Sequence, residues 1–259
     1  MEKTPVSLVI ITHNEEQNIE RCIQSVPFAA DIVVLDSGST DRTVDIARRL
    51  GARVRIEPWR GFQKQKTRAM ALALHDWIVS LDADEALSEE AAKEIQTLLD
   101  ANSMDKDGYE LPRITYHLGR WIRNGGWYPD RQLRFFHREK CKWTETEVHE
   151  RVTGDNIGRL KGAILHWSFN DLADQIETIN RYSGLMAQEW DNKGKSYSSI
   201  KLVTKPIGKF IEKFFVKGGY KDGVPGLIIA IASSFAVFLR FAKLWERKHM
   251  KADDPVRPK

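Results

Sequence analysis

Four short apolar segments alternate with four amphipathic segments in the first hundred residues, and this alternation constrains the fold more than any other feature. The first apolar segment, VSLVII at 6–11, is a β-branched run typical of a strand buried on both faces. Regular alternation of strand and helix predicts a parallel sheet with helices on both faces. The predicted strands are 6–11, 31–36, 53–57 and 77–81, and the predicted helices are 14–26, 39–50, 62–74 and 88–99.

The alternation stops after residue 101. Short strands are expected at 109–116, 132–136 and 147–152, and three helices at 172–190, 206–217 and 224–245. Pro206 is expected to open the second of these helices, and Gly218-Gly219 to close it. The sequence therefore predicts an α/β half, a mixed second half and a helical C-terminal region.

Composition excludes several classes of protein. With 42% hydrophobic and 29% charged residues, the chain resembles an ordinary globular protein and not a disordered or polytopic membrane protein. Two cysteines without metal-binding spacing fit a reducing compartment. The N-terminal apolar run is too short for a signal peptide, so we expect a cytoplasmic protein.

Acidic residues follow three of the predicted strands. Glu15 follows the first, Asp36 ends the second, and Asp82 and Asp84 follow the fourth, with the cationic Lys66 upstream. The carboxyl ends of parallel strands form the ligand edge of an open α/β sheet. Clustered carboxylates repel one another unless a cation lies among them, and Mg²⁺ or Mn²⁺ can bind carboxylate and diphosphate oxygens together. The alternative is that Asp82 and Asp84 only cap the helix that follows.

Other nucleotide sites are missing from the sequence. There is no G-x-x-x-x-G-K-[ST] segment and no G-x-G-x-x-G segment after the first strand. The pattern therefore argues against common ATPases and NAD-dependent enzymes.

The segments VSLVIITHNEEQNIERCIQSV, IVVLDSGSTDRTVDIA and WIVSLDADE resemble the start of family 2 glycosyltransferases. That resemblance implies the GT-A fold, a Rossmann-like nucleotide-diphospho-sugar transferase fold, and inversion at the anomeric carbon. The later segments GGWYPDRQLRFF, EVHE, LHWSF and KGGYKDGVPGLIIAI resemble the branch that adds β-1,4-linked glucose to inner-core heptose of lipopolysaccharide. The implied domains are a GT-A catalytic domain at 1–170, with a nucleotide half at 1–100 and an acceptor half at 101–170, and a helical region at 171–259.

The resemblance also assigns roles to residues of the nucleotide half. Asp84 would bind the divalent metal ion directly, and Asp82 would contact the ribose or a metal-bound water. The first acid of the family's usual Asp-Asp pair, here Asp36, contacts the nucleobase or ribose of the donor. Ser37 replaces the second acid, which weakens the inference about which nucleobase the site selects. The residues implied to border the nucleotide-sugar are Thr12, Asn14, Glu15, Asp36, Lys66 and Asp82.

Displacement at an anomeric carbon needs a carboxylate that deprotonates the acceptor hydroxyl. In the acceptor half we prefer Glu150, which follows a predicted strand, and rank Asp130 second; Glu145 and Glu147 are further candidates. Each of these acids can instead form a salt bridge with a neighbouring arginine.

His166 ends a strand-like run, and in some GT-A enzymes a late histidine completes the metal site. It can equally be a hydrogen-bonded core residue. Trp121, Trp127 and Trp143 can stack on sugar rings or pack in the core.

The C-terminal region is basic, with 15 Lys/Arg and 5 Asp/Glu between residues 193 and 259. Lysines recur every fourth residue from Lys201 to Lys221, and 223–239 is uncharged. Seventeen uncharged residues fall short of the ~20 that span a bilayer. We therefore expect residues 201–248 to lie on an anionic membrane surface, at the inner face of the cytoplasmic membrane. No recognition motif supports nucleic-acid binding.

These observations predict a metal-dependent, inverting hexosyltransferase that moves glucose or a related hexose from a UDP-sugar to a lipid-linked saccharide. The acceptor could instead be a polyprenyl phosphate, an exopolysaccharide or a protein. A non-enzymatic alternative is a membrane-surface binding protein on a degenerate sugar-nucleotide fold.

Overall fold

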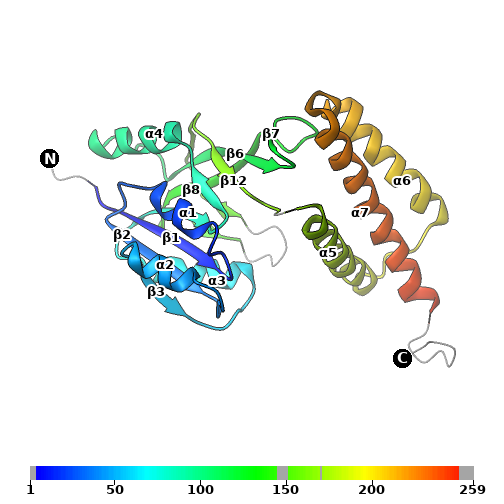
Figure 1. Cartoon of the computed structure of the whole chain (residues 1–259), viewed down its shortest axis with the longest axis horizontal. Coiled ribbons are helices and arrows are strands. Elements are labelled where there is room, and N and C mark those ends of the chain that lie inside the picture. Colours follow the sequence, from blue (N-terminus) through cyan, green and yellow to red (C-terminus); the bar gives the residue numbers. More distant parts are fainter. Residues whose placement is uncertain (1–3, 145–150, 170, 251–259) are drawn as a thin grey trace. The chain divides into compact units, whose positions relative to one another are not determined.

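The computed structural model describes residues 4–144, 151–169 and 171–250 (Figure 1). The chain divides into two compact units. Unit 1 comprises Met1–Thr115 and Pro129–Trp167, and unit 2 comprises Tyr116–Tyr128 and Ser168–Lys259. The segment 116–128, which the sequence placed with the acceptor half, thus groups with the C-terminal helices.

Unit 1 is built on a mixed β-sheet. Along the chain its first strands and helices are β1 (Val6–Thr12), α1 (Ile19–Gln24), β2 (Asp31–Asp36), α2 (Thr43–Arg49), β3 (Arg53–Ile56), α3 (Phe62–Ala71), β4 (Trp77–Asp82), β5 (Glu85–Leu87) and α4 (Glu89–Asp100). The later strands are β6 (Gly108–His117), β8 (Asp130–His137), β9 (Lys142–Trp143), β10 (Val152–Thr153), β11 (Ile157–Arg159) and β12 (Ile164–His166). The last two residues of β6 and the short strand β7 (Arg120–Ile122) belong to unit 2.

The strand order is β3-β2-β1-β4-β8-β6-β12-β5, with β7 and β11 also paired to β6. β3, β2, β1 and β4 are parallel, whereas β8 lies antiparallel between β4 and β6. The four predicted strands and the helices between them are therefore confirmed. Together they form the GT-A-like α/β fold expected from the sequence.

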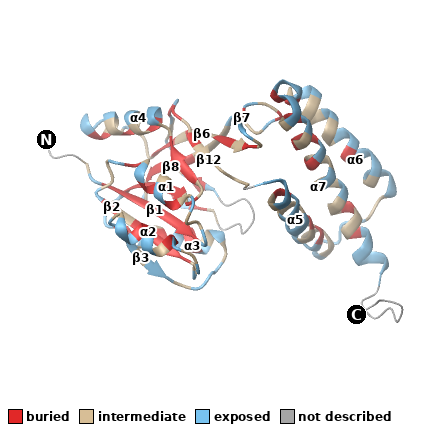
Figure 2. Ribbon diagram, viewed as in Figure 1, coloured by how far each residue is buried: buried red, intermediate tan, exposed pale blue. Residues whose placement is uncertain are grey.

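Both faces of this sheet are covered, and buried residues concentrate along the central strands (Figure 2). Val6, Leu8 and Ile10 of β1 pack with α1, α2 and α4 on one face. Val9 and Ile11 pack with α3 and the β9–β10 pair on the other face. Burial of β1 on both faces explains its uninterrupted apolar sequence.

The second half of unit 1 differs in detail from the sequence expectation. The short strands β5 and β11 were not predicted, because three residues give no periodicity to read. The expected strand at 147–152 falls mostly on 145–150, which lie outside the described residues. Val152 is described, and it pairs with Trp143 in the antiparallel β9–β10 pair.

Unit 2 consists mainly of helices. They are α5 (Leu172–Asn192), α6 (Ser199–Ile211), a π-helical turn η1 (Glu212–Val216), a 3₁₀ turn η2 (Gly219–Asp222) and α7 (Gly223–His249). α7 packs against both α5 and α6.

The expectation that Pro206 opens the second helix is wrong. Ser198 caps α6, where its hydroxyl accepts a hydrogen bond from the Lys201 amide, so the helix starts seven residues earlier and Pro206 lies inside it. Pro206 is buried, and its carbonyl accepts a hydrogen bond from the Ser234 hydroxyl of α7 at 2.8 Å. Proline fits the first helical turn best, but here packing against α7 holds it in the interior of the helix.

Candidate active site

The carboxyl ends of the parallel strands place the polar residues of the nucleotide half along one edge of the sheet. In the strand register Thr12 pairs with Asp36, and Ile11 pairs with Asp82. Thr12 Oγ1 is buried and has no hydrogen-bond partner among the described residues. A buried hydroxyl is normally hydrogen-bonded, so this atom marks the edge as a place where a ligand can bind.

Asp36 shapes the turn that follows β2. Its carboxylate is fully buried and accepts hydrogen bonds from the amides of Gly38 and Ser39, both at 2.9 Å, and from the Ser39 hydroxyl. Both carboxylate oxygens are thus used inside the turn. Because the Asp36 carboxylate is fully buried, contact with a nucleotide, as the resemblance implies, needs the turn to move.

Asn14 and Glu15 join the loop after β1 to the loop after β2. Asn14 has a φ of 56°, in the left-handed region that asparagine tolerates, and its side-chain carbonyl accepts a hydrogen bond from the Thr40 amide at 2.8 Å. The Glu15 amide donates to the Thr43 hydroxyl at 2.8 Å. These two residues therefore fix the shape of the loop border.

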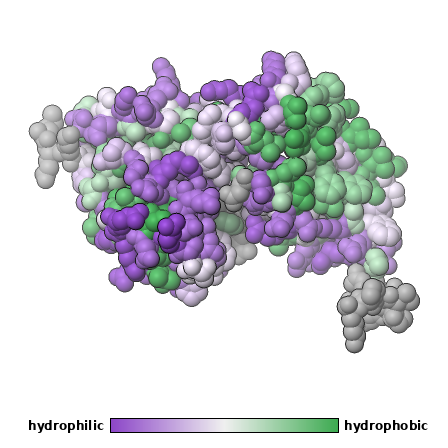
Figure 3. Space-filling model, in the orientation of Figure 1, coloured by the Kyte–Doolittle hydropathy of each residue, from purple (hydrophilic) through white to green (hydrophobic). Residues whose placement is uncertain are grey.

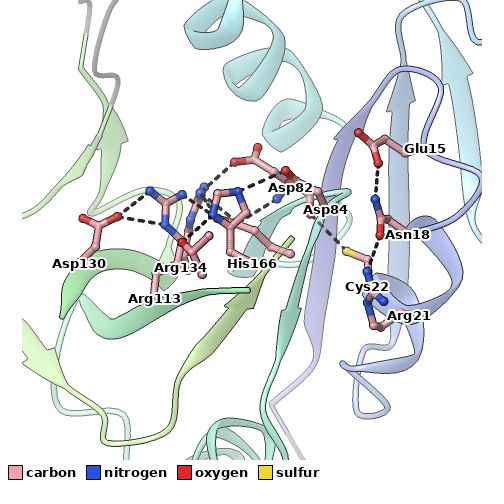
Figure 4. Close-up of polar contacts among 12 residues, drawn as sticks. Glu15, Asn18, Arg21, Cys22, Asp82, Asp84, Arg113, Asp130, Arg134 and His166 are labelled. Carbon is pink, nitrogen blue, oxygen red and sulfur yellow. Dashed lines mark hydrogen bonds and ion pairs between the residues drawn. The ribbon is translucent and has the colours of Figure 1, made fainter. Parts of the chain in front are cut away.

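Asp82 lies between two buried cations. Lys66 Nζ is 2.9 Å from Asp82 Oδ1. Arg134 Nη2 is 2.9 Å from Asp82 Oδ2, and both of these residues are labelled in Figure 4. Burial alone would raise the pKa of the Asp82 carboxyl, but the charges of Lys66 and Arg134 outweigh it and hold the pKa well below its ordinary value. Asp82 is therefore ionised and engaged by the protein itself.

The charge network continues through Glu85, whose carboxylate is not exposed at all. Arg134 Nη2 lies 3.0 Å from Glu85 Oε2, and Arg113 Nη1 lies 2.9 Å from Glu85 Oε1. Arg113 also contacts Asp130 Oδ2, at 2.6 Å from Nη2. Three carboxylates and three cations thus alternate from Lys66 on α3 to Asp130 on β8. Removal of one charge would leave another buried without a partner.

Asp84 faces away from these cations and toward His166. His166 Nε2 lies 3.2 Å from Asp84 Oδ2, and both side chains are partly exposed (Figure 4). The other ring nitrogen, Nδ1, lies 3.5 Å from the Thr115 hydroxyl. β12 brings His166 to this position because it pairs with β5, directly after the Asp82–Asp84 turn.

The pair formed by Asp84 and His166 fits a divalent cation. Neighbouring ligands of an octahedral ion with ~2.1 Å bonds lie about 3 Å apart, close to the spacing between these two atoms. Among the described residues no cluster of three or more His, Cys, Asp or Glu side chains could hold a metal ion. The protein would therefore supply two ligands, and a diphosphate and water would supply the others. Asp82, bound to Lys66 and Arg134, fits an outer position better.

Of the two candidate bases, only Asp130 lies among the described residues. Glu150 lies outside the described residues, as do Glu145 and Glu147. Asp130 is described: Arg113 binds its Oδ2, and Gln132 Nε2 donates to its Oδ1 at 3.0 Å. Both carboxylate oxygens of Asp130 are therefore already bound by donors of the protein.

All three candidate tryptophans contact other residues of the protein. Trp143 is buried beneath the site, with Lys66 Nζ 5.0 Å from its ring centroid. Trp127 stacks on His117 in unit 2, with 5.7 Å between the ring centroids. Trp121 meets Tyr116 edge to face. These contacts account for Trp143 and Trp127 as packing residues.

Sequence reasoning missed Glu85, Arg113 and Arg134 as members of the site. One signal was present: Arg134 interrupts the apolar run of β8 between Leu133 and Phe135, and all three residues are buried. A charged residue inside a buried strand needs a buried partner of opposite charge. Identifying that partner required knowing that β8 pairs with β4.

Comparison with known proteins gives a consistent family signal. Residues 7–162 match the sequence profile of the glycosyl transferase family 2. The lipopolysaccharide core biosynthesis glycosyltransferase LpsC of Rhizobium meliloti is 33% identical over 258 residues, which cover 96% of this chain and 95% of LpsC. An uncharacterised glycosyltransferase of Rickettsia typhi is 32% identical over 253 residues, which cover 93% of this chain and 87% of that protein.

Solved structures are more distant. Glucosyl-3-phosphoglycerate synthase from Mycobacterium tuberculosis, crystallised with Mn²⁺, UDP and glucosyl-3-phosphoglycerate, is 25% identical, with a TM-score of 0.35 over 44% of each chain. S. aureus TarS 1–349 is 13% identical in its complex with UDP-GlcNAc, with a TM-score of 0.47 over 97% of this chain and 93% of TarS.

Proposed function

This chain belongs to glycosyltransferase family 2, and from that premise we propose that it transfers a hexose, most specifically glucose, from a UDP-sugar to a lipid-anchored saccharide of the lipopolysaccharide inner core. The observation that carries the proposal is the sheet edge where Asp82 and Asp84 meet His166, Lys66 and Arg134. The likeness to LpsC along nearly the whole chain supports the class of acceptor.

The donor site uses residues with different tasks. The loops fixed by Asn14, Glu15 and Asp36 form the border on which the nucleoside lies, next to the free hydroxyl of Thr12. Lys66 and the Asp82 carboxylate form the floor beneath the ribose and diphosphate. Because Lys66 already binds Asp82, its ammonium group is held in place before the donor arrives.

Asp84 and His166 would hold a divalent cation, Mg²⁺ or Mn²⁺, against the donor diphosphate. When bound, the cation neutralises the charge that develops on the departing UDP. In that state His166 Nε2 must be unprotonated, so the ring proton lies on Nδ1, next to the Thr115 hydroxyl. Thr115 thereby orients the histidine ring.

Transfer with inversion needs one base on the acceptor side. We assign this role to Glu150, with Asp130 as the second candidate. The bonds from Arg113 and Gln132 to Asp130 support that ranking, because they occupy both carboxylate oxygens and restrain their position. Asp130 would then orient the acceptor side of the site through Arg113.

Unit 2 would hold the enzyme at the inner face of the cytoplasmic membrane. α6 exposes Ile200, Val203 and Ile207 on one side, and α7 exposes a stripe at Val224, Leu227, Ile231, Phe235 and Phe238. Figure 3 shows hydrophobic residues gathered on a face of unit 2 that carries these helices. Exposed apolar areas of this extent mark interaction surfaces, and lysines such as Lys201 and Lys205 on α6 favour an anionic lipid surface.

Two features of unit 2 bear on how it meets lipid. Among the described residues, one helix, Gly219–His249, is long and apolar enough to cross a bilayer. Lys209 and Lys217 share one counter-charge within the protein: both bind the Glu212 carboxylate, and their hydrogen bonds lower the pKa of Glu212 to about 2. We therefore propose peripheral binding in which the apolar stripe contributes more than the lysine row.

Turnover of UDP-glucose by the purified protein tests the donor and metal assignments. We expect slow hydrolysis of UDP-glucose that EDTA abolishes and that Mn²⁺ or Mg²⁺ restores. Full activity in EDTA would reject the cation site. Binding of UDP-glucose with neither hydrolysis nor transfer to any lipid-linked acceptor would favour the non-enzymatic alternative.

A further inference from the structure

Two glycine-containing segments far apart in the sequence meet inside unit 2. One is Asn124-Gly125-Gly126, in the loop between β7 and β8, and the other is the turn from Lys217 to Asp222 between α6 and α7. The Gly125 amide donates a hydrogen bond to the Lys217 carbonyl at 2.9 Å. The catalytic site described above uses neither segment.

Asp222 is the centre of this contact. Its side chain is 2% exposed, and the buried carboxylate receives hydrogen bonds from the Asn124 amide at 2.8 Å and from Asn124 Nδ2 at 3.2 Å. Arg120 Nη2 lies 3.5 Å from the same carboxylate, and Arg120 Nη1 donates to the Asp222 carbonyl at 2.9 Å. A buried carboxylate needs such partners, and here they come from Arg120 of β7 and from Asn124 just after it.

Close packing leaves the turn little freedom to move. A Cβ at Gly226 would lie 1.9 Å from the Gly219 carbonyl oxygen, and a Cβ at Gly219 would lie 2.7 Å from the Lys213 carbonyl oxygen. Only glycine permits these approaches. The loop therefore binds a stiff turn and not a flexible connection.

A second contact holds the start of the same loop. His117, at the end of β6, is buried, and its Nε2 lies 3.1 Å from Gln175 Oε1 of α5. The His117 ring also packs against Trp127 and Phe169. Segment 116–128 is thus attached to the helices of unit 2 at both its start and its tip.

This segment is the covalent connection between two strands of the active site. It begins at the last two residues of β6, the strand that carries Arg113 and Thr115, and it precedes β8, which carries Asp130 and Arg134. Beside Asp222, the α6–α7 turn exposes four apolar residues: Phe215, Val216, Tyr220 and Val224.

We propose that Asp222, through Asn124 and Arg120, is a positioning residue that couples lipid-bound unit 2 to the acceptor-side strands β6 and β8. The inference rests on the proposed function, since it assumes a lipid-linked acceptor. With the α6–α7 turn seated on lipid, Asp222 holds the 116–128 segment in one conformation, and this segment continues directly into the strands that carry Arg113 and Asp130. The contact is not needed for hydrolysis of free UDP-glucose.

Three assays on the full-length protein test the coupling in the variants Asp222→Asn and Asn124→Ala. They measure binding to vesicles that contain anionic lipid, hydrolysis of UDP-glucose, and glucose transfer to vesicle-embedded lipopolysaccharide from a strain that lacks this gene. We expect vesicle binding and hydrolysis to stay at the level of the unsubstituted protein. Transfer should fall roughly ten-fold or more, as for loss of a buried charge-assisted hydrogen bond.

The matched control is Asp191→Asn, which removes a carboxylate that pairs with Arg247 at 3.3 Å elsewhere in unit 2. It should leave all three measurements unchanged. Unchanged transfer in both test variants would overturn the coupling, and so would a loss of vesicle binding in proportion to transfer, because that result indicates only a damaged fold. If the unsubstituted protein hydrolyses no UDP-glucose and transfers nothing, the proposed function itself is rejected.

Discussion

The two units place charged and apolar side chains in opposite ways. Unit 1 buries cations inside its sheet: Lys66 and Arg134 are 5% and 4% exposed. Unit 2 exposes large apolar side chains, among them Ile200 at 74% and Ile231 at 53%. Each arrangement is costly for a chain alone in water, since buried charges lose their hydration and exposed apolar surface gains nothing from folding.

These two energetic costs indicate where each unit would bind a ligand or a membrane. In unit 1 the buried cations lie at the carboxyl edge of the sheet, where a diphosphate would bind. In unit 2 the apolar stripe follows α7 from Val224 to Phe238, where lipid would cover it. The comparison predicts that substitutions in unit 1 lower the catalytic rate and the free energy of unfolding. Substitutions in unit 2 should instead lower the affinity of the protein for membranes.

The largest effect is expected at Asp84. Asp84→Asn should reduce UDP-glucose turnover by roughly 10⁴-fold, equivalent to the several kcal/mol that a catalytic cation supplies. Asp76→Asn is a matched control, because Asp76 precedes the opposite end of the same strand and pairs with Arg138. Steady-state kinetics at saturating Mn²⁺ measure the turnover of both variants. If Asp84→Asn is as active as Asp76→Asn, Asp84 is not a metal ligand.

The base ranking predicts the next effect. Glu150→Gln should lower transfer ~10²–10⁴-fold, as for loss of a positioned base. Binding of UDP, measured by calorimetry, should barely change. Asp130→Asn should have a smaller effect on turnover, because Arg113 already holds Asp130. An inactive Asp130→Asn variant beside an active Glu150→Gln variant would reverse the assignment.

Arg134 tests the buried charges themselves. Arg134→Met leaves Asp82 and Glu85 with fewer partners in the sheet, so the free energy of unfolding should fall by ~3–5 kcal/mol. Arg138→Met breaks a more exposed ion pair with Asp76 and should cost at most ~1 kcal/mol. Urea denaturation monitored by tryptophan fluorescence gives both values. Equal losses of unfolding free energy in the two variants would mean that burial does not make the Arg134 ion pairs more important than the exposed Arg138 pair.

Apolar substitutions in unit 2 should act on membrane binding alone. Burial of one large apolar side chain is worth ~1.5–3 kcal/mol, so the double variant Ile231→Ser, Phe235→Ser should bind vesicles roughly 10²-fold more weakly. Ile56→Ser removes a similarly exposed side chain from unit 1 and serves as the control. Vesicle sedimentation at low and high salt measures both variants. Binding that vanishes at high salt would mean that the lysines dominate instead.

The smallest effect is a pH dependence in unit 2. Burial lowers the pKa of His117 below its ordinary value of 6.5, and the Gln175 hydrogen bond only partly opposes this. The neutral histidine is therefore favoured in the folded protein. Its contribution to stability is present above pH 6.5 and is lost as the pH falls below that value.

Hydrogen exchange of α5 amides between pH 7.5 and 5 measures this contribution. Protection of α5 should fall toward pH 5 in the unsubstituted protein and less so in His117→Gln. A pH profile that is identical in the two proteins would show that His117 does not titrate as its burial implies.

The nucleotide half could be predicted from the sequence, because strands such as β1 are buried on both faces and their apolar runs are unambiguous. The contact between Asp84 and His166 could be expected only by resemblance, since 82 positions separate the two residues. Arg113 and Arg134 were missed because the antiparallel insertion of β8 between β4 and β6 is a long-range property. Ser198 was missed as a helix cap because Pro206 gave a stronger local signal.

The most direct test of the account is mass spectrometry of lipopolysaccharide from a strain that lacks this gene. We expect the core to lack one hexose. The unsubstituted chain and Asp76→Asn should restore the hexose, and Asp84→Asn should not. An unchanged core in the deletion strain, or full restoration by Asp84→Asn, would contradict the claim that this chain adds a hexose to lipopolysaccharide through the Asp84 site.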